Sequence, residues 1–301
     1  MPSQSKNRAG SARQRTAQAR RDRAAQLREE RARQERRGRM MRSGGIVGAV
    51  VAVIVIVVVV GLVTKKHPKS GTPTSTAPAT AVQQASSVPA SVFAQVGAGS
   101  ASAAPKTVSG QPVADTNGHP TVLFVGAEWC PYCATERWPM VVALSRFGTF
   151  SNLGRTASSP SDTYPNTQTF SLHGATYTSQ YLSLDAKELQ SNQVTGGHYA
   201  SLDTLTSAEQ ANFKKAGGGF PYINLGGKYT VGTQLNPALL QGKTMEQIAA
   251  ALSDPTSDIA KAIDGAANLF TAGLCTLTNN QPASVCTAAP IPSLESQIGG
   301  S

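Results

Sequence analysis

Beyond its first 43 residues the chain lacks any net charge. The 301 residues hold 27 Lys and Arg against 17 Asp and Glu, and residues 1–43 alone hold 14 of the basic and 4 of the acidic ones. The whole positive excess therefore lies in one short segment. This distribution excludes a folded domain with a basic face, the usual footprint of a nucleic-acid binder. The basic segment also lacks aromatic residues for base stacking, so no nucleic-acid partner is expected.

Metal-binding residue types are also scarce. The chain has four histidines and four cysteines. The histidines are scattered in the sequence: His67, His119, His173 and His198. A zinc site around Cys130 and Cys133 would need a second close pair of ligands, and none is present. Export-side copper handling is disfavoured because no Met or His cluster accompanies the cysteines. We therefore expect no metal and no cofactor.

Residues 45–63 contain no charged or hydrogen-bonding side chain. As a helix these residues would span about 28 Å, close to the thickness of a bilayer core. The basic segment before them is too long for a cleaved signal peptide, and Lys65-Lys66 occupies the place of a cleavage site. Lys and Arg are denser before this run than after it, which predicts a cytoplasmic N-terminus. We expect an uncleaved signal-anchor in the cell membrane and an extracytoplasmic remainder, where disulfides persist.

Composition divides the chain into five predicted segments. They are a basic cytoplasmic tail at 1–43, a single transmembrane helix at 44–64, a Pro/Ser/Thr/Ala-rich linker at 65–112, a folded domain at 113–289 and a C-terminal tail at 290–301. The linker is too poor in apolar residues to order itself, and it is long enough to hold the domain clear of the membrane. Within it, apolar residues at helical spacing over 88–96 predict one outlying helix.

Local patterns in the domain predict a mixed α/β fold. A short apolar run predicts a buried strand at 121–126, and helical periodicity follows at 131–147. Helix starts are predicted at two capping boxes and at an N-cap before proline: Thr206–Glu209, Thr244–Gln247 and Asp254-Pro255. Apolar runs around Gly226-Gly227 predict a hairpin.

The sequence Cys130-Pro131-Tyr132-Cys133 carries the clearest chemical signal. Two cysteines separated by two residues at a helix start can close a small disulfide ring. The free backbone N–H groups and the helix dipole there stabilise a thiolate on Cys130. Cys133, one helical turn on, is placed to attack a mixed disulfide. The alternative interpretations are an inert structural disulfide and half of a zinc site.

The segment from Ala127 to Cys133, with the apolar run before it, resembles the strand–turn–helix active site of thioredoxin-like proteins. The segment 219–232 resembles their cis-proline loop and the hairpin that follows it. The resemblance implies a thioredoxin-like domain and a cis Phe220–Pro221 bond, with Pro221 facing the cysteine pair and binding the substrate backbone. Trp129, Tyr132 and Phe220 are expected near the substrate.

The arrangement of basic head, apolar span, linker, CPYC motif and a late cysteine pair is similar to a family of membrane-anchored thioredoxin-like proteins. That family is known as the domain-of-unknown-function 929 family, and the resemblance covers roughly residues 88–290. In an oxidising compartment Cys275 and Cys286 are expected to form a structural disulfide. A relay pair that exchanges with Cys130 and Cys133 is the alternative.

Three features depart from the thioredoxin pattern. Phe124 stands where thioredoxins carry a buried acidic residue, and Glu128 is expected at the surface. An insertion from about residue 151 to 217 separates the CPYC helix from Pro221, and it would form a lid, a partner surface or simple decoration. No charged or His residue lies between the cysteines, so the helix end and its surroundings must stabilise a thiolate. Arg137 and Trp138, on the helix, are interpreted as structural.

Together these features predict a membrane-anchored, extracytoplasmic thiol–disulfide oxidoreductase. Cys130 would exchange with its substrate, Cys133 would resolve the mixed disulfide, and Pro221 would shape the peptide-binding edge. The alternative is a non-catalytic binding or scaffold protein whose CPYC bridge is structural. The expected partners are exported proteins with thiols or disulfides, a membrane redox partner and, through residues 45–63, the lipid bilayer.

Overall fold

The computed structural model describes residues 68–101, 103–109, 113, 115 and 117–300. The predicted tail at 1–43 and the predicted transmembrane helix at 44–64 lie outside these residues. Within the described part of the chain, no helix combines the length and the apolar character needed to cross a membrane.

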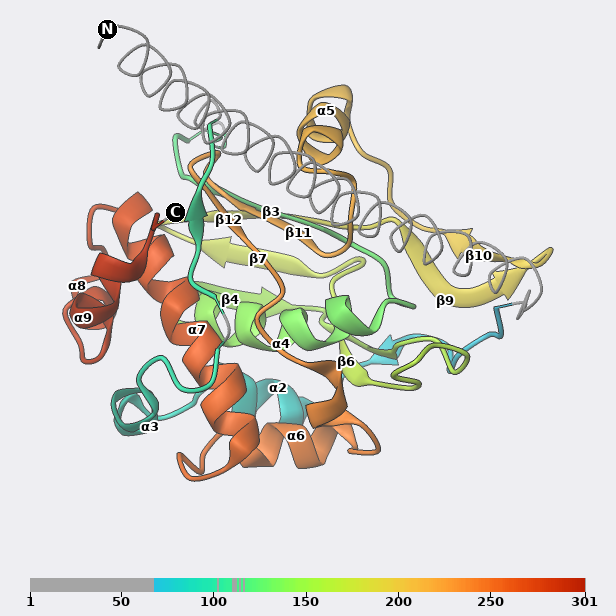
Figure 1. Cartoon of the computed structure of the whole chain (residues 1–301), viewed down its shortest axis with the longest axis horizontal. Coiled ribbons are helices and arrows are strands. Elements are labelled where there is room, and N and C mark those ends of the chain that lie inside the picture. The colour runs from blue at the N-terminus through green and yellow to red at the C-terminus, as the bar shows by residue number, and fades with distance from the viewer. Residues whose placement is uncertain (1–67, 102, 110–112, 114, 116, 301) are drawn as a thin grey trace, which may run out of the picture. The chain divides into compact units, whose positions relative to one another are not determined.

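A five-stranded sheet organises the described residues, with the strand order β2-β12-β11-β3-β8. Strand β3 (Thr121–Gly126) pairs in parallel with the edge strand β8 (Ser183–Glu188) and antiparallel with the central strand β11 (Tyr222–Leu225). The hairpin partner β12 (Tyr229–Val231) joins β11 to the short edge strand β2 (Lys106–Thr107). The predicted strand and the predicted hairpin are both present, at the centre of the sheet (Figure 1).

The two faces of this sheet are covered by different elements. Val122 and Phe124 of β3 belong to the large core formed with α4 (Pro131–Leu144) and α7 (Asp258–Leu277). Leu123 and Val125 face the other way and form a small cluster with Phe213 of α5 (Ser207–Lys215). Alternate residues of a strand point to opposite faces, so this one apolar run supplies both sides. The result is a mixed α/β architecture.

The chain between α4 and α5 is rich in strands. The strands of this segment pair as β4 (Gly148–Ser151) with β7 (Thr176–Ser179), β5 (Gly154–Ala157) with β6 (Gln168–Ser171), and β9 (Gln190–Thr195) with β10 (His198–Ser201). The sequence predicted this region as an insertion. The structure differs in one respect, because β8 lies within it and completes the central sheet beside β3.

The structure also differs from the linker prediction for residues 65–112. Here β1 (Ser75–Thr76) pairs with β5, and the helix α2 (Ala79–Ser86), which was not predicted, follows. The next helix, α3 (Ala90–Val96), is the outlying helix predicted over 88–96. Ala81 and Ala85 of α2 are buried in the large core, and so is Phe93 of α3. Alanine loses no side-chain rotamer freedom on burial. An Ala-rich helix can therefore pack in the core although its composition is typical of a linker. Order begins at Gly71 or earlier, because its N–H donates to Asn192 O at 2.8 Å.

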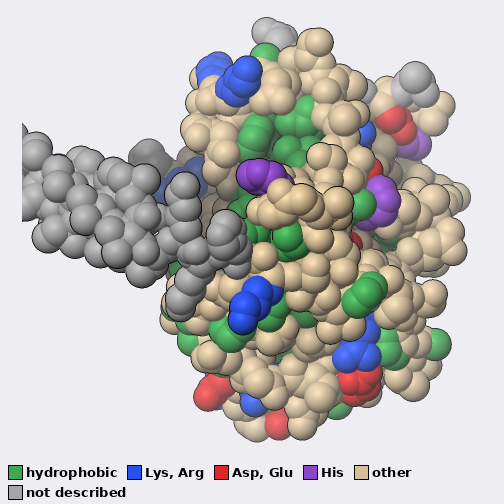
Figure 2. Space-filling model, turned by 90° about the vertical axis from the view of Figure 1, so that its right-hand side faces the viewer, with side chains coloured by type: hydrophobic (Ala, Val, Ile, Leu, Met, Phe, Trp, Pro, Cys, Tyr) green, Lys and Arg blue, Asp and Glu red, His purple; other side chains and the backbone are tan. Residues whose placement is uncertain are grey.

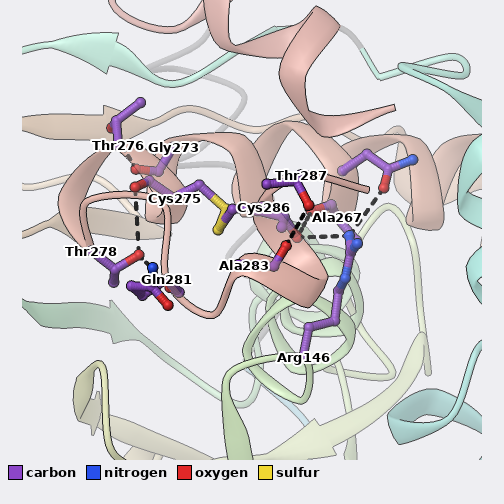
Figure 3. Close-up of a disulfide and its surroundings, with 12 residues drawn as sticks. Arg146, Ala267, Gly273, Cys275, Thr276, Thr278, Gln281, Ala283, Cys286 and Thr287 are labelled. Atoms are coloured by element: carbon purple, nitrogen blue, oxygen red, sulfur yellow. Dashed lines mark hydrogen bonds between the residues drawn. A yellow bond between two sulfur atoms is a disulfide. The ribbon is translucent and has the colours of Figure 1, made fainter. Parts of the chain in front are cut away.

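The C-terminal residues continue the fold beyond the predicted boundary at residue 289. Cys275 of α7 is bonded to Cys286 at the end of α8 (Ala283–Cys286), with 5.6 Å between their Cα atoms (Figure 3). The next helix, α9 (Ile291–Leu294), buries Ile291 and Leu294 in the core. The prediction of a C-terminal tail at 290–301 therefore fails for α9. The remaining helices are α6 (Met245–Ala251), η1 (Pro237–Leu240) and η2 (Glu295–Gln297).

The surface of the described residues is weakly charged. On the face drawn in Figure 2, hydrophobic side chains form small separate groups, and charged side chains are scattered among polar ones. The exposed large hydrophobic residues in the described part of the chain are Val113 and Tyr132. Tyr132 lies in the CPYC motif, so one of the two borders the cysteine pair.

Candidate redox site

The turn from β3 to α4 places Cys130 at the N-cap of the helix. Its backbone is extended there, with φ −81° and ψ 122°, and Pro131 occupies the first turn. The N–H of Cys133 donates to Cys130 Sγ at 3.4 Å. Both cysteines are free thiols, with exposed fractions of 5% for Cys130 and 0% for Cys133. The sulfur of Cys130 therefore takes the place of the oxygen that commonly caps a helix.

The two thiols differ in their acidity. A hydrogen bond from the Cys133 side chain, helped by the N–H of Cys133, lowers the pKa of Cys130 although burial opposes the change. Burial raises the pKa of Cys133 well above its usual value, and the bond to Cys130 adds to the effect. One thiol of the pair is thus favoured as the thiolate, while the other retains its proton.

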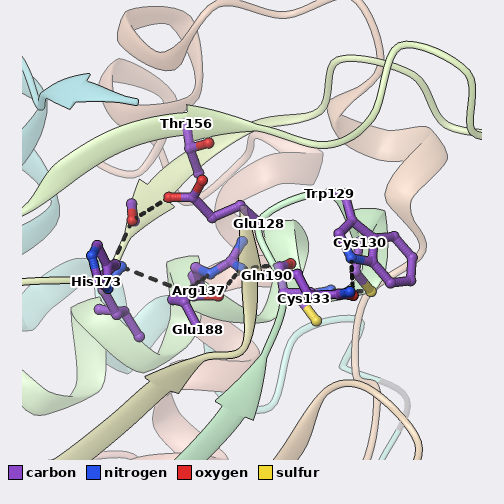
Figure 4. A network of polar contacts seen from close by, with 12 residues as sticks. Glu128, Trp129, Cys130, Cys133, Arg137, Thr156, His173, Glu188 and Gln190 are labelled. Carbon is purple, nitrogen blue, oxygen red and sulfur yellow. Dashed lines mark hydrogen bonds and ion pairs between the residues drawn. The ribbon is translucent and has the colours of Figure 1, made fainter. Parts of the chain in front are cut away.

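A buried ion pair lies close behind the cysteines (Figure 4). Arg137 and Glu188 are both 0% exposed and share two bonds of 2.7 Å. Arg137 also donates to the backbone oxygen of Ala127 at 2.9 Å, the same oxygen that accepts from the N–H of Cys130. Its positive charge lowers the pKa of both cysteines. The sequence identified Arg137 only as a structural residue; the structure adds this electrostatic effect.

Glu128 is buried, which corrects the expectation that it lies at the surface. It is 1% exposed and accepts hydrogen bonds from Ser171 Oγ at 2.6 Å and from Thr74 Oγ1 at 2.9 Å. These partners come from β6 and from the segment before β1, so no local pattern around residue 128 could reveal them. The guanidinium of Arg137 lies over the ring of Phe124, 5.6 Å from its centroid.

Aromatic side chains surround the cysteine turn. The ring of Trp129 stacks on Tyr199 at 5.2 Å and meets Phe220 edge-on at 6.1 Å. The expected neighbours Trp129 and Phe220 are therefore brought together, whereas Tyr132 instead contacts Tyr164 at 6.1 Å. Tyr199 lies in β10 of the insertion, and no sequence pattern indicated that it would contact Trp129. The insertion thus places an aromatic ring against Trp129, the residue before Cys130.

Pro221 precedes β11 at the same end of the sheet. Tyr222 pairs with Val125 near the end of β3, so the loops that carry Cys130 and Pro221 start from adjacent strands. The Phe220–Pro221 bond is cis, as the resemblance implied. The late cysteines are bonded to each other, which agrees with the predicted disulfide. No group of three or more metal-ligating side chains is found among the described residues.

Residues 105–205 match the family model of a domain of unknown function, DUF929. This match supports the resemblance to the domain-of-unknown-function 929 family. It covers Cys130, Cys133, Arg137 and Glu188, but it ends before Pro221 and α7. No curated protein and no solved structure matches the chain.

Proposed function

We propose that the protein is a thiol–disulfide oxidoreductase whose redox centre is the Cys130–Cys133 pair. The observation that carries the proposal is the unequal acidity of the two thiols at the start of α4. The pKa of Cys130 is lowered and that of Cys133 is raised. A thiolate at the N-cap is both a competent nucleophile and a good leaving group in exchange.

In the reducing direction, the thiolate of Cys130 attacks one sulfur of a substrate disulfide. A mixed disulfide forms, and the other substrate sulfur leaves as a thiolate. The proton of Cys133 passes to the substrate thiolate released in the first step, and Cys133 attacks Cys130 Sγ, which releases the second substrate sulfur as a thiolate. The substrate gains two electrons, and the Cys130–Cys133 disulfide forms. The oxidising direction is the reverse of these steps.

A thioredoxin-like fold is part of this proposal. It is supported by the parallel pair β3–β8, by the helix that begins after Cys130 and by the hairpin β11–β12 after Pro221. The proposed location, in the cell membrane with the redox domain outside the cytoplasm, is supported by the uncharged run at 45–63 and the basic residues before it. Exported proteins with thiols or disulfides are the proposed substrates.

Trapping tests the proposal directly. A Cys133→Ser variant cannot resolve the mixed disulfide, so it should accumulate thiol-sensitive adducts with exported proteins through Cys130. The Cys130→Ser/Cys133→Ser variant is the matched control and should form none. If the single variant forms no adducts, and the purified protein exchanges disulfides no faster than a simple dithiol, the proposed function is wrong.

The reduction potential of Cys130–Cys133 separates this proposal from the scaffold alternative. Structural disulfides usually have potentials below about −300 mV, whereas working pairs lie higher. We expect a value above that limit, because a stabilised Cys130 thiolate favours the reduced form. Equilibration with a glutathione or dithiothreitol redox buffer provides the measurement. A value well below the limit would indicate a permanent bridge.

A further inference from the structure

A cavity of about 820 Å³ lies on the face of the sheet that carries α5. Its walls come from α5, from the strands β2, β11 and β12, and from the segment that leads into β11. Phe220, Pro221 and Tyr222 are among the residues that line it. The cavity therefore begins at the proposed cis-proline loop and extends away from it over the sheet.

The strand register gives this cavity a polar floor. Lys106 is paired with Thr230, Thr230 with Asn224, and Asn224 with Leu123. Residues directly opposite each other on neighbouring strands share one face of a sheet, so these four side chains form a row. Leu123 lies in the cluster under Phe213. The three polar members of the row all line the cavity.

The charge of the cavity has one sign. Lys106 on the floor and Lys215 on the wall line it, and the described lining residues include no Asp or Glu. The ammonium of Lys215 donates to Ser109 O at 3.2 Å, and an ammonium has three donors in all. On the next strand, β8, Asp185 lies opposite Leu123, and its carboxylate is bound by Lys187 at 2.8 Å.

The cavity and the redox site are adjacent, because Phe220 belongs to both. Phe220 lines the cavity and contacts Trp129, the neighbour of Cys130, at 6.1 Å. A polypeptide whose sulfur is at Cys130 and whose backbone passes Pro221 would continue into this cavity. The side chains that follow the reacting cysteine would then meet Lys106 and Lys215.

We propose that this cavity binds acidic side chains of the substrate polypeptide next to its reacting cysteine. The inference rests on the proposed function and specifies the substrate class: disulfide-bearing segments with Asp or Glu close to the cysteine. Carboxylates complement the two lysines. The side-chain NH2 group of Asn224, whose Oδ1 already accepts from the N–H of Gly227, is a further donor. The proposal is independent of the direction of electron transfer.

Paired model substrates test this proposal on the full-length chain. Two disulfide peptides would differ only in the residues after the cysteine, which are Asp and Glu in one and Asn and Gln in the other. We expect kcat/KM to be about five- to tenfold higher for the acidic peptide at low salt, as two ion pairs at a partly exposed site allow, and the preference should weaken with salt. In a Lys106→Gln/Lys215→Gln variant the two kcat/KM values should become equal.

A matched variant controls for general charge effects. Lys243→Gln/Lys261→Gln removes two charges from residues that do not line the cavity, and it should retain the preference. Equal kcat/KM for both peptides in the wild-type chain, with turnover intact, would overturn the inference and leave the proposed function standing.

A binding measurement separates the two hypotheses if turnover is absent. The Cys130→Ser/Cys133→Ser chain cannot exchange, so fluorescence anisotropy of the labelled acidic peptide reports only binding. We expect it to bind at least about fivefold more tightly than the neutral peptide. Equal affinity would reject the acidic site whatever the outcome of the redox assay.

Discussion

Arg137 gives the cysteine pair a permanent positive neighbour that the dipeptide between the cysteines does not supply. A guanidinium remains protonated in proteins, and the charge of Glu188 raises its pKa further although burial opposes this. Because both partners are completely buried, water does not screen their effect on the sulfurs. The thiolate of Cys130 is therefore stabilised by the N-terminal turn of α4 and by the guanidinium of Arg137.

Replacing Arg137 by Gln should raise the pKa of Cys130 and reduce stability. The pKa rises because one of the charges that favours the thiolate is lost. Stability should fall by about 3–5 kcal/mol, because Glu188 remains buried without its partner. The ultraviolet absorbance of the thiolate, followed against pH, measures the first effect, and urea unfolding measures the second. An unchanged thiolate titration in a folded variant would contradict the electrostatic role.

Glu136 predicts a pH dependence of stability. Its Oε1 accepts from the N–H groups of Gln234 and Leu235 at 2.5 and 3.0 Å, while Oε2 has no partner among the described residues. Burial raises the pKa of this carboxyl from 4.5 to about 8. The folded state thus keeps a proton that the unfolded state loses above its lower pKa. The contribution to stability is complete below about pH 4.5 and is lost as the pH rises through about 8.

A Glu136→Gln variant tests this dependence, because glutamine keeps an acceptor for the two N–H groups and does not ionise. Asp264, whose pKa burial also raises to about 8, contributes a loss in the same direction. Burial also raises the pKa of Glu188, which adds to the same loss. We therefore expect the decline in unfolding free energy between about pH 5 and pH 8 to become shallower in the variant without disappearing. Urea titrations across this range provide the measurement. An equally steep decline would show that Glu136 is ionised throughout.

At the residue scale, sequence alone predicted the chemistry that is encoded locally. Cys130 and Cys133 lie within one motif, so their place at the start of a helix could be inferred. The burial of Glu128 and the position of Arg137 depend on Thr74, Ser171 and Glu188, which are distant in the sequence. No local pattern contains that information.

Secondary-structure elements with local start and stop signals were predicted well. The capping boxes at Thr206 and Thr244 each begin a helix, and Gly226 and Gly227 adopt positive φ angles of 58° and 74° in the predicted hairpin. The start of α7 was placed too early, because Ser257, rather than Asp254, caps it. Most strands between α4 and α5 were not predicted, because polar and apolar residues do not alternate in them, as in β9 (Gln190–Thr195).

The disulfide of α7 and α8 gives a prediction at this scale. A Cys275→Ala/Cys286→Ala variant should lose about 2–3 kcal/mol of stability, as expected for a loop of this length. Amide exchange should accelerate most in α8 and α9, while α4 remains protected. Chemical unfolding with hydrogen exchange measures both. Uniformly faster exchange in every element would instead show that the disulfide stabilises the whole fold and not only its C-terminal helices.

At the scale of the whole molecule, the matched family segment and the folding unit do not coincide. Residues 105–205 include β3, α4 and β8 but lack β11, β12 and α7, which cover both an edge and a face of β3. A fragment limited to 105–205 should therefore remain unfolded by circular dichroism. The fragment 68–301 should show a cooperative thermal transition, because it contains every element of the core, including α2 and α3. A cooperative transition in the shorter fragment would refute this.

The first hydrogen bonds of the described residues lie close in sequence to the uncharged run. The N–H of Lys69 donates to Ser161 Oγ at 3.3 Å, and Ser70 Oγ accepts from the N–H of Val194 at 2.9 Å. If the bilayer span ends at residue 64, as we propose, only residues 65–68 separate it from Lys69, and four residues reach at most about 14 Å. Under that proposal the redox site would be held near the membrane, and substrates would have to reach it there.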